Sequence, residues 1–155
     1  MTQLLKIVET PGPIACNMAT AGDTPRERLA EYGRLFAHAL VARSRSEAAV
    51  ELSFAAKPGV PEWVVDLARR EAACCPFCTY EVQRQGDRIV WRTSTQAGSD
   101  VMALLDSFYA LPEHLGDGLE GYLERLSASG VSVTSPEPGR FQFERRTPSK
   151  EGCGC

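Results

Sequence analysis

The chain has 155 residues, of which 43% are hydrophobic, and its formal net charge is −3. This length supports one well-buried core, so we predict a single domain over residues 1–146 and a flexible tail over 147–155. The 20 acidic and 17 basic residues are interspersed, and without a basic stripe no nucleic-acid partner is expected. No apolar stretch approaches the roughly 20 residues that span a bilayer, and no signal peptide is recognisable. We therefore expect a cytoplasmic protein with no membrane partner.

The first half of the domain predicts a helix followed by a strand. Thr24 and Glu27 stand at capping-box spacing around Pro25, and apolar residues then recur at helical intervals, which predicts a helix over residues 25–42. Residues 47–56 alternate apolar and polar side chains instead, which is typical of a half-buried strand.

The middle of the chain predicts a second helix and a hairpin. Pro61 opens a helical pattern that continues to Cys74, and Pro76 ends it. Residues 78–95 alternate around a Gly86-Asp87 turn, which indicates a β-hairpin. The cysteine cluster is thus expected on a turn from helix to strand.

The last part predicts two more helices and a second hairpin. One helix begins at a Ser99 cap and ends before Pro112, and a shorter one runs over residues 119–126 and stops at Gly130. Residues 131–134 and 141–144 then form the hairpin. The whole pattern predicts an α+β fold with an antiparallel sheet and helices packed on one face.

Cysteines carry the chemistry of this sequence. Three lie within five residues, at Cys74, Cys75 and Cys78, and two more close the chain at Cys153 and Cys155, while Cys16 stands alone near the start. Clustered thiolates select soft ions such as mercury, copper(I), zinc, cadmium or trivalent arsenic. The two-residue gap from Cys75 to Cys78 lets both sulfurs reach one ion or form one disulfide.

The spacing of the cysteines does not settle which of them would bind a metal ion. No second cysteine pair lies at zinc-finger spacing, and neither His38 nor His114 has a ligand spacing from the cluster. A tetrahedral zinc finger is disfavoured, while a site of two or three thiolates that uses Cys16 with Cys74, Cys75 or Cys78 remains open. The alternative is that these cysteines are only buried as small hydrophobic side chains, or that the tail pair is idle.

A redox role is the competing interpretation. Cys75-Pro76-Phe77-Cys78 resembles the active-site tetrapeptide of glutaredoxins and related thiol oxidoreductases. In that family the motif opens a helix, whose N-terminus lowers the pKa of the first thiol. Here the motif follows a helix, so the helix dipole is expected to raise thiol pKa values. A thioredoxin fold is therefore disfavoured, though thiol exchange is not.

A longer segment, Glu71-Ala72-Ala73-Cys74-Cys75-Pro76-Phe77, resembles a signature of small bacterial proteins associated with heavy-metal resistance. Ile14-Ala15-Cys16 and the helix around Arg28-Leu29-Ala30 also resemble that group, which extends the similarity over about residues 13–110. The adjacent cysteine pair followed by an aromatic residue is also similar to organomercurial lyases. Both resemblances imply soft-metal chemistry.

We therefore expect capture or detoxification of a mercury-like ion (mercury, copper(I) or zinc) by thiolates. The alternative is a thiol enzyme, a lyase or an oxidoreductase, that uses Cys75 and Cys78 on a small thiol-reactive substrate, with Glu71 as a proton donor. A third alternative is a small-ligand module between helices and sheet, and a homodimer also remains open. The candidate metal ligands are Cys16, Cys74, Cys75, Cys78, Cys153 and Cys155.

Overall fold

The structure, a computed structural model, describes residues 1–10, 12, 14–96, 101–137 and 140–145. Its strands are β1 (Thr2–Ile7), β2 (Ala15–Asn17), β3 (Leu40–Ser46), β4 (Ala49–Ala55), β5 (Thr79–Gln85), β6 (Arg88–Ser94), β7 (Val131–Glu137) and β8 (Arg140–Arg145). Its helices are α1 (Pro25–Ala39), α2 (Val60–Cys74), α3 (Met102–His114), the short 3₁₀ helix η2 (Leu115–Asp117) and α4 (Gly118–Ala128).

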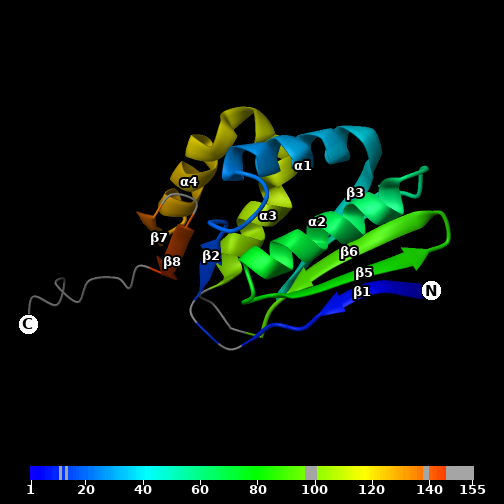
Figure 1. The fold of residues 1–155 in the computed structure, drawn as a ribbon, viewed down its shortest axis with the longest axis horizontal. Helices are drawn as coiled ribbons and strands as arrows, with labels where there is room; N and C mark the ends of the chain where they lie inside the picture. The colour runs from blue at the N-terminus through cyan, green and yellow to red at the C-terminus, as the bar shows by residue number, and fades with distance from the viewer. Residues whose placement is uncertain (11, 13, 97–100, 138–139, 146–155) are drawn as a thin grey trace, which may run out of the picture.

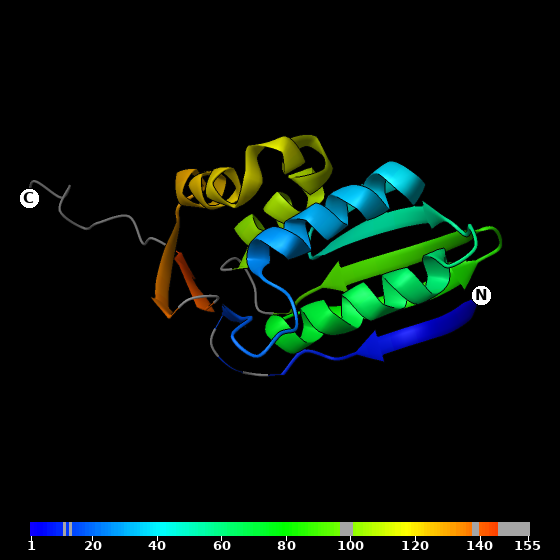
Figure 2. The same ribbon diagram turned by 45° about the horizontal axis from the view of Figure 1, so that its top comes forward.

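The main layer is a five-stranded antiparallel sheet in the order β1-β5-β6-β4-β3. Helices α1 and α2 lie across one face of this sheet, as Figures 1 and 2 both show. The predicted α+β class, with an antiparallel sheet and helices on one face, is confirmed.

The alternation of side chains along β4 explains which face is covered. Val50, Leu52 and Phe54 are completely buried, whereas Glu51 on the opposite face pairs with Arg92 of β6 and both side chains remain about 40% exposed. Because neighbouring side chains in a strand point to opposite faces, one face forms the core and the other stays polar. Trp91 of β6 joins the buried set beneath the helices.

The C-terminal hairpin does not extend the main sheet. β7 and β8 form a separate three-stranded sheet with the short strand β2, in the order β2-β8-β7. In this register Cys16 of β2 lies opposite Phe141 of β8. The N-terminal segment therefore pairs with the C-terminal hairpin, at the end of the molecule where α3 and α4 lie (Figure 1).

Strands β1, β2 and β3 are not among the predicted elements, and the ends of two helices differ most from the predictions. The first helix ends at Ala39 rather than at residue 42, because Leu40 has extended backbone angles and begins strand β3, which pairs with β4. That pairing gives the backbone groups of residues 40–46 hydrogen-bond partners in β4.

The third helix also differs, since it continues through Pro112 to His114. Proline removes one N–H donor there, but Leu111 just before it is buried in the core, and this packing outweighs the local cost. The predicted Ser99 cap lies outside the described residues. The fourth helix and Gly130, which has a φ of 87°, agree with the prediction.

Among the described residues, no helix is both long enough and apolar enough to cross a membrane.

Candidate functional site

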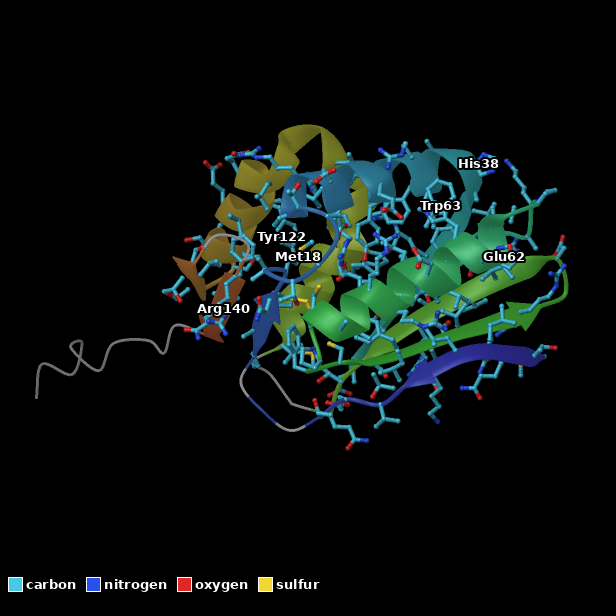
Figure 3. The ribbon with its side chains drawn as sticks, viewed as in Figure 1. Met18, His38, Glu62, Trp63, Tyr122 and Arg140 are labelled. Atoms are coloured by element: carbon cyan, nitrogen blue, oxygen red, sulfur yellow. A yellow bond between two sulfur atoms is a disulfide. The ribbon has the colours of Figure 1, made fainter. Side chains whose placement is uncertain are left out.

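The cysteine cluster opens onto a cavity of about 150 Å³. The cavity lies where α1, α2, α3, α4 and the small sheet meet, and Figure 3 labels two residues of its lining, Met18 and Tyr122. Cys16, Cys74, Cys75 and Cys78 all line it. The fold therefore brings the four cysteines of the described residues to one place.

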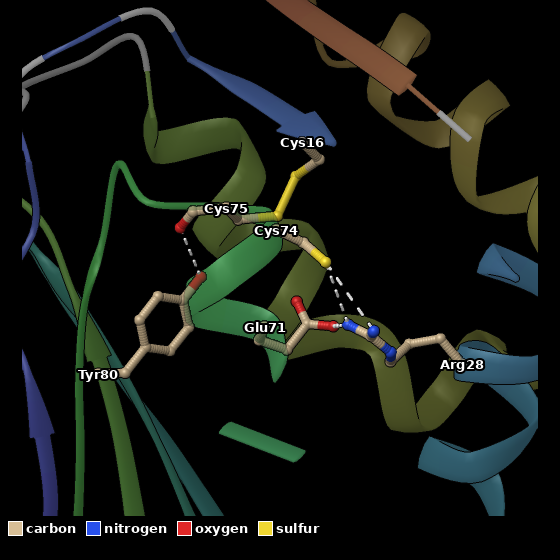
Figure 4. The surroundings of a disulfide bond; sticks show 6 residues. All are labelled: Cys16, Arg28, Glu71, Cys74, Cys75 and Tyr80. Carbon is tan, nitrogen blue, oxygen red and sulfur yellow. Dashed lines mark hydrogen bonds and ion pairs between the residues drawn. A yellow bond between two sulfur atoms is a disulfide. The ribbon is translucent and has the colours of Figure 1, made fainter. Parts of the chain in front are cut away.

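Two of these cysteines form a disulfide. Cys16 of β2 is bonded to Cys75, the residue that caps the C-terminus of α2, with Cα atoms 4.6 Å apart (Figure 4). The bond links residues that are 59 positions apart in the sequence. It thereby fastens the small sheet to the helix that carries the cysteine motif.

The other two cysteines are buried thiols. Cys74 is 5% exposed and Cys78 is 4% exposed. Burial raises the pKa of the Cys78 thiol to about 12, and the negative charges of Glu9 and Glu71 add to this effect. Both thiols line the same cavity as the disulfide.

A buried arginine stands beside Cys74. Arg28, in the first turn of α1, is 3% exposed, and both of its terminal nitrogens lie 3.9 Å from the Cys74 sulfur (Figure 4). Burial raises the pKa of the Cys74 thiol, while the charge of Arg28 and its hydrogen bonds to the sulfur offset part of that rise. Arg28 is thus the cation placed to stabilise a Cys74 thiolate.

Two carboxylates hold Arg28 in position. Its guanidinium donates to both oxygens of Asp23, at 2.6 and 2.7 Å, and to Glu71 of α2 at 2.8 Å. Burial disfavours the arginine charge, but these two acceptors outweigh it and raise the pKa of Arg28. An arginine buried among two carboxylates and a sulfur is both paired and charged, as such a group must be to tolerate burial.

The same ion pairs continue along the surface between α1 and α2. Arg70 of α2 contacts Asp23 and also Glu31 of α1, and the Trp63 indole N–H donates to Glu31 at 2.9 Å. These contacts fix the two helices against each other. The cavity end of α2 is therefore anchored to α1 by charge as well as by apolar packing.

The turn that carries Cys75 to Cys78 is held by hydrogen bonds. The Thr10 amide donates to the Pro76 carbonyl at 3.0 Å, and the Tyr80 hydroxyl donates to the Cys75 carbonyl at 3.1 Å (Figure 4). The Cys75 amide itself donates to the Glu71 carbonyl at the end of α2. These bonds fix the backbone around the cysteines, so the sulfur positions do not depend on the disulfide alone.

Most of the remaining lining is apolar. α3 and α4 contribute leucine and aromatic side chains, among them Leu104, Phe108 and Leu123. Two lining residues, Tyr32 and Thr93, have buried hydroxyl oxygens that make no hydrogen bond of normal geometry with the described residues. Burial first, and the nearby Glu71 carboxylate second, raise the pKa of Tyr32 well above its ordinary value.

The predicted site residues divide into three groups. Cys16, Cys74, Cys75 and Cys78 come together, and Glu71 lies beside them, although its carboxylate pairs with Arg28. Cys153 and Cys155 lie outside the described residues. Within the described ranges, no group of three or more His, Cys, Asp and Glu side chains is arranged to hold a metal ion.

Sequence reasoning missed Arg28, Asp23 and Tyr32 as site residues. Arg28 had a detectable signal, because it lies one helical turn before Tyr32 and on the same helix face as Leu35 and Ala39, all of them buried. A charged residue in line with a buried stripe usually has a buried partner. Asp23 precedes the helix, and nothing in the sequence indicated that it would turn back to Arg28.

Comparison of the chain with protein-family models, with curated proteins and with solved structures yields no significant match. The resemblances to heavy-metal-resistance proteins and to organomercurial lyases therefore stay predictions.

Proposed function

We propose that the reduced protein captures a soft, mercury-like metal ion between the sulfurs of Cys16 and Cys75. The observation that carries this proposal is the convergence of four cysteines from β2, α2 and the following turn on one cavity. The disulfide supports it further, since two sulfurs that can bond to each other are close enough to share one ion after reduction and a small adjustment.

The character of the cavity favours a divalent soft ion with two thiolates. Such a complex has no net charge, because each lost thiol proton leaves one negative sulfur. A neutral complex costs little to bury in an apolar cavity, whereas a zinc ion with four thiolates carries two negative charges that need compensation. Cys74, beside Arg28, and Cys78 are available as additional ligands.

The oxidation state of the Cys16–Cys75 pair controls this function. In the disulfide neither sulfur is a thiolate, so neither is a strong metal ligand. A dithiol reductant converts the bond to two thiols and is itself oxidised to a cyclic disulfide. A cytosolic location, where such reductants are abundant, fits this requirement.

The test is a titration of reduced full-length protein with Hg(II), Cu(I) and Zn(II), followed by thiolate-to-metal absorption. We expect sub-micromolar, one-to-one binding of Hg(II), its loss in the Cys16→Ser and Cys75→Ser variants, and weaker binding of Zn(II). The Cys153→Ser/Cys155→Ser variant also lacks two thiols and should still bind one Hg(II), although it should lose the ion faster to a chelator, so it separates loss of the Cys16–Cys75 pair from loss of thiols in general. Failure of all three ions to bind the reduced protein would overturn the proposal.

A thiol enzyme is the second candidate, and the disulfide favours its thiol-exchange form, because it shows that Cys75 has a partner with which it can form and break a bond. In organomercurial cleavage, two thiols would take the mercury, one thiol proton would pass to the carbon and the other would leave to solvent, with Glu71 as the carrier. The buried Cys78 thiol, with its pKa raised to about 12, is a poor nucleophile at neutral pH. If Cys75→Ser and Cys78→Ser both kept full turnover of an organomercurial, this candidate would be excluded.

A further inference from the structure

The cavity is larger than a metal ion requires. A bare ion bound between two sulfurs fills a small part of about 150 Å³. The cavity is partly open to the surface, and an apolar space of about this volume accepts a guest the size of benzene. The volume beyond the sulfurs therefore has room for a group of about six carbon atoms.

The walls of this extra volume are built for an apolar group. Leu104, Leu105 and Phe108 of α3 and Leu119 and Leu123 of α4 supply no atom that binds a metal or replaces its hydration water. A hydrated ion would lose water there without compensation. An apolar group is instead transferred favourably from water to such walls.

We propose that the ligand is a soft centre that carries one apolar organic group, such as a monoaryl arsenic(III) species, with the soft atom on Cys16 and Cys75 and the organic group among the α3 and α4 side chains. This inference rests on the proposed function, because it names the ligand class of the same thiol pair. Arsenic(III) with one aryl group has two further bonding positions, which matches two thiolates.

The binding reaction is a ligand exchange. After a dithiol has reduced the Cys16–Cys75 bond, two arsenic–sulfur bonds form and two arsenic–oxygen bonds break in the aryl arsenous acid. The two thiol protons leave with the two hydroxides as water, and arsenic remains trivalent. No oxidant is consumed, and the product is uncharged, as the apolar surroundings require.

The experiment compares phenylarsenous acid with inorganic arsenite in competition with a small dithiol. Full-length protein with Cys153→Ser/Cys155→Ser is reduced with a phosphine, and affinities are measured relative to the dithiol, which cancels the intrinsic thiol preference of each arsenical. We expect the protein to favour the phenyl compound over arsenite by about tenfold or more, since burial of the ring adds apolar contact.

Cavity-filling variants make the test specific. Leu123→Trp and the milder Leu119→Phe occupy the proposed aryl space and are expected to weaken phenylarsenous acid binding about tenfold while changing arsenite binding less than about twofold. Val41→Trp, at an exposed position of β3, is the matched control and leaves both unchanged. If Leu123→Trp does not fold, two results decide the outcome: binding by Leu119→Phe, and the ratio of phenyl compound to arsenite affinity in protein whose cavity is unchanged.

The outcomes separate the two proposals. Arsenite and Hg(II) binding without preference for the phenyl compound, or equal weakening of both arsenicals by the filling variants, overturns the ligand class and leaves metal capture intact. Absence of binding by Hg(II) and by both arsenicals overturns metal capture itself.

Discussion

Cys16 and Cys75 are joined across 59 positions of sequence, and their bond ties the small sheet to the C-terminus of α2. The same two residues line the cavity. One bond thus acts on both the stability of the fold and the availability of the proposed metal ligands.

Reduction of this disulfide is expected to lower stability. A cross-link that closes a loop of this length restricts the unfolded chain by about 4 kcal/mol in the chain-entropy description. Urea unfolding of wild-type protein with and without reductant measures the difference. The Cys16→Ala/Cys75→Ala variant is expected to unfold identically under both conditions, and a redox effect that persists in it would contradict the assignment of this bond.

Replacement of Arg28 is expected to destabilise the protein strongly. Arg28→Met leaves Asp23 and Glu71 without their shared cation in a largely buried place, at a cost of about 3 kcal/mol. Arg28→Lys keeps the positive charge but not the bidentate contact with Asp23, so it should lose less stability than Arg28→Met. Arg26→Met is the control, because Arg26 is an exposed neighbour on α1 that pairs with Glu120. Urea unfolding measures these differences. Similar urea midpoints for the Arg28→Met and Arg26→Met variants would disprove the structural role of Arg28.

Stability is expected to fall in acid through Asp23 and Glu31. The hydrogen bond from Arg28 lowers the pKa of Asp23, and the one from Arg70 lowers that of Glu31. A carboxyl whose pKa is lower in the folded state stabilises it above the unfolded pKa, near 4, and this contribution is lost as the pH falls through the folded value. The free energy of unfolding, measured between about pH 6 and about pH 2, should decline less steeply in the Asp23→Asn/Glu31→Gln variant than in the wild-type protein. The exposed Glu62→Gln change should leave the slope as it is.

The Cys78 thiol is expected to react slowly with alkylating reagents. With a pKa of about 12, its thiolate fraction at about pH 8 is about 10⁻⁴, and burial limits access further. Iodoacetamide labelling followed by peptide mass analysis measures the alkylation rate of Cys78. This rate should still rise with pH above about pH 9, where the alkylation rate of an ordinary thiol levels off. Denatured protein provides the control, and rapid labelling of native Cys78 at neutral pH would contradict the burial of this thiol.

The C-terminal cysteines are expected to assist metal retention without stabilising the fold. Deletion of residues 152–155 should leave the thermal midpoint unchanged, while metal is lost faster to a competing chelator, because two further thiols of the same chain no longer rebind it. Cys153→Ser/Cys155→Ser keeps the chain length and should behave in the same way. Equal metal retention by the full chain and both variants would limit the site to the four internal cysteines.

Local sequence patterns predicted the α+β class and most elements, although not β1, β2 or β3. The alternation in residues 78–95 and the Gly86-Asp87 turn indicate a hairpin, and the structure has β5 and β6 there. Such local signals are reliable because backbone period and turn chemistry are set by neighbouring residues. The sequence also predicted a site that uses Cys16 with the Cys74–Cys78 cluster, and the structure brings these cysteines to one cavity, while soft-metal chemistry there stays a prediction.

The way in which these residues meet depends on tertiary packing. The pairing of β2 with β8 places Cys16 at the end of α2, and this long-range contact has no local signal. The end of α1 at Ala39 and the passage of α3 through Pro112 follow from strand pairing and core packing, which overrule local preference. The ion pairs that bury Arg28 beside Cys74 depend on two helices packed together, because burial makes the pairing of a charge obligatory.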